Sequence, residues 1–180
     1  MVLKFIFFSK HLCFLHVYLL LLNYLAAMGE EHVITLDAET NLAIFYQAQE
    51  KFDLAEPLHL SSLAKKTKLY GEDGTTTLMA MNNLACVYGD LDQHDKAEKL
   101  FIRCLELRTA KFGEHHIDTV STMSNLSGLY IKMGQLDKAE LLCSKSVEIS
   151  TKLLGTVYIH IYLHRQHSIV KPTYILTYCR

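Results

Sequence analysis

Three asparagines recur at intervals of 42 residues, and their side chains are well suited to bind another polypeptide. Asn41, Asn83 and Asn125 each stand directly before a leucine in a stretch of helical periodicity. A carboxamide donates and accepts hydrogen bonds at once, so it can follow the backbone of an extended or helical segment without reading its sequence. The column is therefore chemically suited to a peptide-binding surface. A buried amide that ties one helix to its neighbour would also recur once per repeat, so a structural role stays open.

Residues at helical spacing around the asparagines extend this predicted surface. They are small, uncharged and mixed in type, and none is a lysine or an arginine. The set is Thr40, Ile44 and Gln47 in the first repeat, Asn82, Cys86 and Gly89 in the second, and Ser124, Gly128 and Ile131 in the third.

Catalytic patterns are scarce in this sequence. It has no phosphate-binding GxxxxGK[ST] loop, no GxGxxG turn after a strand, no HExxH and no GxSxG. The doublet His115-His116 is the one pair that a metal hypothesis could use, and adjacent residues on a loop rarely converge on one ion. We therefore predict a non-enzyme with no cofactor, no catalytic residue and no metal site.

The elements that position these side chains follow from a repeat of 42 residues. Gly29, Gly71, Gly113 and Gly155 mark its joints, and the units between them align without an insertion. In the middle unit, apolar residues recur every three or four positions over 78–88 and again over 97–107, separated by a turn at 91–94. Each unit is thus expected to form two amphipathic helices, helix A and then helix B, with the joint glycine ending helix B. Small residues on both helices (Ala43, Ala85 and Ser127 on A; Ala55, Ala97 and Ala139 on B) allow their backbones to approach.

The repeated block resembles the tetratricopeptide repeats, in the 42-residue version of the kinesin light chains and related adaptors. The resemblance rests on N-N-L-A-x-x-Y at residue 82, on the Ala-Glu pair nine residues after its tyrosine and on the G-E-x-H form of the joint, and it covers residues 29–155. It implies an all-α fold: an α-solenoid of three helix-turn-helix repeats, 29–70, 71–112 and 113–154. It also implies a concave groove, lined by helix A, in which the asparagines bond the backbone of a partner's peptide.

Two features of that family are missing from this chain. The basic clamp that some tetratricopeptide domains use to hold the carboxylate of a chaperone tail has no counterpart among the groove candidates, so we expect no chaperone tail as ligand. The heptads with which kinesin light chains hold the motor heavy chain are also absent. An adaptor or protein-interaction module is therefore the first prediction. A kinesin light chain fragment acting in cargo transport along microtubules is the alternative.

The two flanks differ from the repeats in composition. All 19 acidic residues fall within 29–155, whereas 1–28 and 156–180 contain none. The leader 1–28 fits a signal or anchor segment, a helix that caps the first repeat, or a segment foreign to the natural protein. With a genuine anchor, the chain would be a membrane-anchored structural protein. The tail 156–180 is expected to be irregular, and its Val157-Tyr158 start is compatible with translated intron.

The charge distribution and the cysteines indicate which class of partner and which cellular compartment to expect. The acidic repeat block argues against nucleic acid, which requires clustered lysine and arginine. The five cysteines are odd in number and show no CxxC spacing, which favours free thiols in a reducing compartment. We expect a cytoplasmic protein, with cytoskeletal association as one setting, that binds another protein or peptide.

Overall fold

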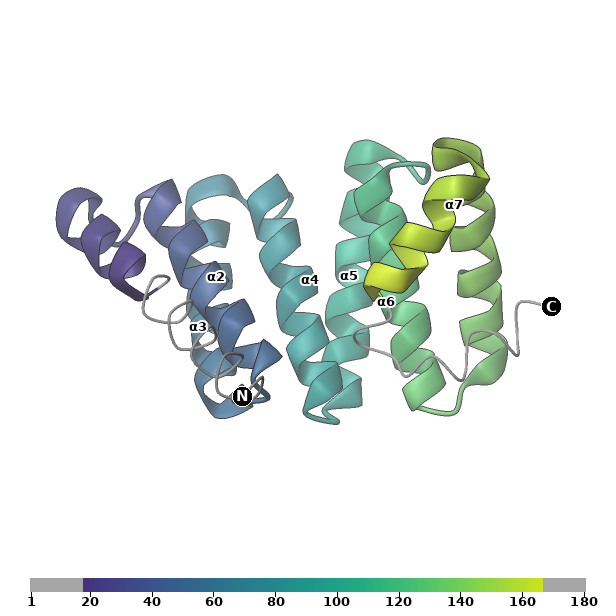
Figure 1. Ribbon diagram of the computed structural model, residues 1–180, viewed down its shortest axis with the longest axis horizontal. Helices are drawn as coiled ribbons and strands as arrows, with labels where there is room; N and C mark the ends of the chain where they lie inside the picture. The colour runs from purple at the N-terminus through teal and green to yellow at the C-terminus, as the bar shows by residue number, and fades with distance from the viewer. Residues whose placement is uncertain (1–17, 167–180) are drawn as a thin grey trace, which may run out of the picture. The chain divides into compact units, whose positions relative to one another are not determined.

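The computed structural model describes residues 18–166, including the side chains of 18–152, and this part of the chain consists of helices joined by short turns (Figure 1). A helical segment over 18–28 comes first. It is followed by α2 (Val33–Ala48), α3 (Phe52–Tyr70), α4 (Thr75–Asp90), α5 (His94–Phe112), α6 (Ile117–Lys132) and α7 (Leu136–Gln166). The all-α prediction is confirmed. The chain divides into two compact units, Met1–Val87 and Tyr88–Arg180.

The helix boundaries follow the period of the sequence. The first residues of α2, α4 and α6 are 42 positions apart, and so are those of α3, α5 and α7. The first set is helix A of each repeat and the second is helix B. Gly71 and Gly113 follow the ends of α3 and α5 with φ of 78° and 85°. Glycine is favoured at both joints because any residue with a Cβ would be strained in this positive-φ backbone conformation.

The fourth joint glycine does not end its helix, which corrects our expectation of an irregular tail from residue 156. The backbone of α7 continues through Gly155 to Gln166. A glycine inside a helix costs only about 1 kcal/mol relative to alanine, so it permits a break without imposing one. At the earlier joints the chain turns into the helix A of the next repeat, whereas residues 156–166 do not follow the repeat pattern. Our interpretations of 1–17 and 167–180 lie outside the described residues.

In the first unit, α2 packs against α3 through small and polar side chains. Ala43 and Ala55 are fully buried, as the prediction of close backbone approach requires. The Thr40 hydroxyl lies 2.9 Å from Ser62 Oγ and accepts a hydrogen bond of 3.0 Å from Lys66 Nζ. The same face of α3 buries His59 completely. The helix pair therefore holds two basic side chains in its interior.

In the second unit, α5, α6 and α7 share an interior of small and apolar residues. Val120, Met123 and Ile149 form a buried cluster, with Leu105 and Leu142 packed against it. Ala97 is fully buried, and Ser127 Oγ donates a 3.0 Å hydrogen bond to the carbonyl of Ala139. That bond requires α6 and α7 to approach closely where the sequence places small residues on both helices.

Gly74 explains why the second repeat departs from the others at its joint. His32 and His116 cap α2 and α6, where the Nδ1 of each accepts the backbone N–H two residues later. Gly74 holds the equivalent position before α4. A Cβ there would lie 2.7 Å from the Cβ of Tyr70 and 2.8 Å from its carbonyl oxygen. No side chain fits without displacing the end of α3.

Replacing Gly74 with alanine should lower the free energy of unfolding by about 1–3 kcal/mol through overpacking. Urea denaturation of the full chain, followed by circular dichroism, measures this. His32→Ala is the matched change at the equivalent position of the first repeat, and there only the cap is lost, at about 1 kcal/mol. A Gly74→Ala protein as stable as the unaltered chain would contradict the packing described at Tyr70.

Among residues 18–166, the structure contains no helix that is both long and apolar enough to cross a membrane.

Candidate functional site: the exposed face of helix A

Helix A of the first repeat is accessible along one narrow stripe. Between residues 34 and 44 of α2, only Ile34, Asp37, Asn41 and Ile44 are exposed, and the seven residues between them are buried. The four are spaced by three or four residues, which keeps them on one side of an α-helix. With the described residues in place, this side is the accessible part of the helix's central turns.

The equivalent residues of the other two repeats show the same pattern. In α4 the accessible residues between 76 and 86 are Thr76, Met79, Asn83 and Cys86. In α6, residues 118 to 128 leave Asp118, Ser121, Asn125 and Gly128 partly accessible, together with Ser124 at one edge. We call these twelve equivalent residues, four per helix A, the A face. Each helix A thus carries one asparagine on its accessible side.

The A face includes six of the twelve predicted groove residues. Besides the three asparagines, these are Ile44, Cys86 and Gly128, which follow the asparagines by three positions. Asn41 is exposed, and Asn83 and Asn125 are half-buried. All three asparagine residues are thus at least partly accessible to solvent.

Two of the residues directly before the asparagines, Thr40 and Asn82, are packed, and we correct their assignment to the groove, whereas Ser124 is partly accessible. Thr40 is buried between α2 and α3, where its hydroxyl bonds Ser62 and Lys66. Asn82 is also buried, and the Ser124 hydroxyl donates to the carbonyl of Val120 within its own helix. Consecutive helix residues are rotated by about 100°, so the neighbour of an exposed residue faces a packed side.

The last three predicted residues lie beyond the A face toward the end of each helix A. Gln47 and Ile131 are half-buried, and Gly89 is buried. A Cβ on Gly89 would lie 3.6 Å from Leu129 Cδ1. Gly89 is therefore a packing position, and we remove it from the site.

Sequence reasoning missed the half of the A face that precedes the asparagines. These residues lie four and seven positions earlier in each helix: Ile34 and Asp37, Thr76 and Met79, and Asp118 and Ser121. Met79 is 51% exposed, which is unusual for methionine in a helix packed on its other sides. Extending the spacing of three and four backward from each asparagine would have identified them.

One turn beyond the A face, an ion pair links two successive helices A within the second unit. Lys132 of α6 lies 3.0 Å from Asp90 Oδ1, and its Nζ also donates to the carbonyl of Gly89 at 3.1 Å. Asp90 and Lys132 hold equivalent positions in their repeats. The only basic side chain on the helices A from α2 to α6 is therefore engaged with the protein itself.

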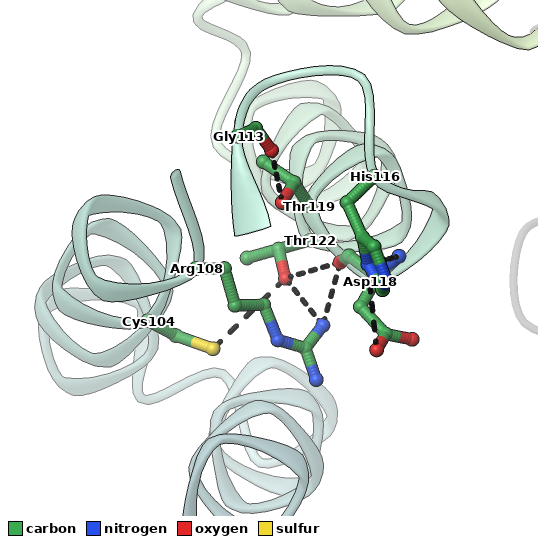
Figure 2. A network of polar contacts seen from close by, with 7 residues as sticks. All are labelled: Cys104, Arg108, Gly113, His116, Asp118, Thr119 and Thr122. Atoms are coloured by element: carbon green, nitrogen blue, oxygen red, sulfur yellow. Dashed lines mark hydrogen bonds and ion pairs between the residues drawn. The ribbon is translucent and has the colours of Figure 1, made fainter. Parts of the chain in front are cut away.

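A buried arginine supports the start of α6 from beneath. Arg108 is 4% exposed, and its Nη1 donates to the carbonyl of Asp118 at 2.6 Å and to Thr122 Oγ1 at 2.8 Å. Thr122 also contacts Cys104 Sγ at 3.9 Å, and burial raises the pKa of that thiol. Figure 2 shows the Asp118 carboxylate turned away from the guanidinium and toward His116. Arg108 thus orders the first turn of α6 and leaves the carboxylate on the accessible side.

The same close-up shows how the joint before α6 is fixed. Thr119 Oγ1 donates to the carbonyl of Gly113 at 2.9 Å, and His116 Nδ1 accepts from the backbone of Asp118 at 3.2 Å (Figure 2). The imidazole of His116 also stacks on Phe112 at 4.6 Å. His116 is therefore a helix cap. Among the described residues, no three His, Cys, Asp or Glu side chains group as metal ligands would.

Tyr130 and Glu98 join two repeats on the other side of α6. The tyrosine hydroxyl donates to Glu98 Oε1 at 2.9 Å. Burial, reinforced by this carboxylate, raises the pKa of Tyr130 to about 12. The ammonium of Lys138 lies 4.9 Å from the Tyr130 ring centre, and Lys96 lies 5.0 Å from that of Tyr88. These recurrent contacts order the helices that carry the A face.

Comparisons with known proteins agree with this description. A family model described as tetratricopeptide repeat matches residues 34–109 and 87–152. Among solved structures, BtubC (BKLC) from P. vanneervenii is similar with a TM-score of 0.71 at 23% identity, over 82% of this chain and 59% of that one.

A protein described as a kinesin light chain with nearly identical TPR-like repeats, from Podosopora anserina, was solved in two forms. One crystal structure is similar at a TM-score of 0.69 and 20% identity, over 82% of this chain and 70% of that one. The crystal structure of a substituted form gives 0.69 and 20%, over 81% and 68%. No curated protein sequence matches. The chain spans less than two thirds of BtubC, and identities this low establish a shared fold.

Proposed function

Because the chain belongs to the tetratricopeptide repeat family, we propose that it is a protein-interaction module whose A face binds a peptide segment of a partner protein. The observation that carries the proposal is the burial pattern of helix A. In each repeat the side chains in the central turns of helix A are buried except along one accessible stripe. An asparagine lies on that stripe. Extended surfaces built from successive helices are the usual binding sites of such repeats.

The chemistry of the A face suits a polypeptide ligand. Asparagine side chains can bond the peptide groups of a partner, while Ile34, Ile44 and Met79 offer exposed apolar area to its side chains. Two carboxylates and no basic group complete the face. This composition lacks the clustered cations that a nucleic acid requires.

Changing Asn41, Asn83 and Asn125 together to alanine should abolish partner capture and leave the fold intact. Hydrogen bonds lost from a binding interface cost about 0.5–1.5 kcal/mol each, so three of them weaken affinity on the order of 10- to 1,000-fold. The tagged full chain and its triple variant are each used to capture partners from a lysate of the native cell. Mass spectrometry identifies the captured proteins, and circular dichroism verifies the helix content of both forms.

The chain offers a matched control on helix B. Thr67, Thr109 and Thr151 also recur at the repeat interval, and Thr67 and Thr151 bond carbonyls of their own helices. Changing these three to alanine removes one polar group per repeat away from the A face and should leave capture unchanged. Equal capture by the asparagine variant and the unaltered chain would refute the proposal.

The fold similarity to a kinesin light chain favours one alternative, a fragment that acts in microtubule-based cargo transport. Such a fragment would co-purify with a motor heavy chain, and recovery of the chain without one argues against it. For either function we propose a cytoplasmic location, because Cys86, Cys104 and Cys143 are thiols outside any disulfide and a reducing compartment keeps them so.

A further inference from the structure

The charges of the helices A are distributed unevenly, and this defines the kind of peptide that the proposed site would take. The A face carries Asp37 and Asp118 and no lysine or arginine. Elsewhere on α2, α4 and α6 the charged residues are Glu39, Asp90 and Lys132, and each has an ion-pair partner. A ligand on the A face therefore meets carboxylates, amides and apolar groups.

The carboxylate of Asp37 is accessible and only partly compensated. Its side chain is 57% exposed, and the partner that the structure gives it is Lys66 Nζ, 3.4 Å from Oδ1. That ammonium is itself buried and lies closer to Thr40 Oγ1, at 3.0 Å. A second cation approaching from solvent would meet the carboxylate first, with Lys66 behind it.

Asp118 is the accessible carboxylate of the second unit, at the position equivalent to Ile34, and a buried cation lies near its backbone. Arg108, which is equivalent to Lys66 in the repeat, donates to the backbone carbonyl of Asp118 and leaves its carboxylate outside. The carboxylate lies 3.7 Å from His116 Nδ1. This nitrogen accepts the Asp118 N–H, so it has no proton to donate to the carboxylate. In Figure 2 the guanidinium is joined to the backbone carbonyl of Asp118 and the carboxylate to His116, and the Asp118 side chain is 38% exposed.

Exposed apolar side chains lie along the same stripe of α2 as Asp37, with Ile34 one turn before it and Ile44 two turns after it. Met79 holds the position equivalent to Asp37 on α4. A carboxylate bracketed by aliphatic groups matches a lysine or arginine whose long aliphatic stem lies on the apolar groups while its head reaches the carboxylate. Glutamate and aspartate in the same place would meet like charge.

We infer that the A face selects a basic and apolar peptide, in which lysine or arginine residues alternate with aliphatic or aromatic ones. This inference rests on the proposed function and names the partner's chemistry. Charge complementarity carries it, since each unit has one accessible carboxylate on its part of the A face, and the basic side chains near them, Lys66 and Arg108, are buried.

Selection of a random 12-residue peptide library on the immobilised full chain tests the inference and requires no identified partner. Peptides are kept only if the variant with Asn41, Asn83 and Asn125 changed to alanine fails to bind them. We expect this set to be enriched in lysine and arginine next to apolar residues. Enrichment in aspartate and glutamate would overturn the inference and leave the proposed function standing, whereas a library without any asparagine-dependent binder would refute both.

Neutralising the two carboxylates provides a second test of the inference. The double variant Asp37→Asn and Asp118→Asn should bind the selected basic peptide about three- to tenfold more weakly, as two exposed ion pairs imply, and the loss should shrink in high salt. Asp53→Asn with Asp137→Asn is the matched control, because both are exposed and lie in the first turn of a helix B, one in each unit. Equal affinities of both double variants would overturn the assignment of the carboxylates.

Discussion

Changing Arg108 to alanine is expected to lower the free energy of unfolding by about 2–4 kcal/mol, measured by urea denaturation of the full chain. Two causes add. The carbonyl of Asp118 and the hydroxyl of Thr122 lose the donor that satisfies them at 2.6 and 2.8 Å. The side chain is also 4% exposed, so its removal leaves a cavity beneath α6. No partner charge is left buried by this change, because the two groups that Arg108 bonds are neutral oxygens.

Two further variants separate these causes from a general effect of removing an arginine. Arg103 lies on the same helix, is 48% exposed and pairs with Glu106 at 3.6 Å, so Arg103→Ala should cost less than about 1 kcal/mol. Arg108→Lys introduces the residue found at the equivalent position of the first repeat and should recover part of the loss. Arg103→Ala and Arg108→Ala proteins of equal stability would contradict the role of the network in Figure 2.

Acidification should destabilise the first unit through His59. Its imidazole is fully buried, and neither ring nitrogen has a hydrogen-bond partner among the described residues. Burial, assisted by the nearby charge of Lys66, lowers the pKa of His59 to about 4. The unfolded chain has the ordinary value of about 6.5 and takes up the proton first. The stability due to a neutral His59 is thus complete above about pH 6.5 and is lost as the pH falls toward 4, by about 3 kcal/mol in all.

His59→Phe isolates this contribution, because Phe101 fills the equivalent buried position in the second repeat. Unfolding free energies of both proteins are measured between pH 7 and pH 4. Carboxylates contribute equally to the two profiles, so the unaltered chain should lose about 3 kcal/mol relative to the variant over that range. Parallel profiles would show that His59 is protonated or solvated in the folded protein.

The helix boundaries were predictable because the residues that mark them recur in successive repeats. Joint glycines, apolar spacing and the turn at 91–94 agree between units, and glycine with positive φ does end α3 and α5. The fourth glycine misled us, since its helix continues to Gln166. A glycine permits a helix to end without imposing an end, and the residues directly after Gly155 do not follow the repeat pattern.

The direction of the side chains was predictable only in part. Residues three positions after an asparagine share its accessible stripe, whereas Thr40 and Asn82, one position before, are packed. Periodicity alone does not say which polar residues of a helix are accessible when the helix is packed on nearly all sides. The interior roles of His59 and Arg108 were hidden for a similar reason, because both residue types are usually found near solvent. Only comparison with the burial of Phe101 and Lys66, at the equivalent positions, reveals a core column there.

Two cysteines allow the most direct test that the A face is the binding surface. Cys86 lies on the A face and Cys143 lies on the helix B of the last repeat, and both are half-buried. The rates at which a thiol reagent alkylates each are measured by mass spectrometry for the full chain, alone and bound to a captured partner. We predict that the partner slows alkylation of Cys86 and leaves Cys143 unchanged. Slower alkylation of Cys143 with an unchanged rate at Cys86 would place the binding surface on helix B and contradict the account.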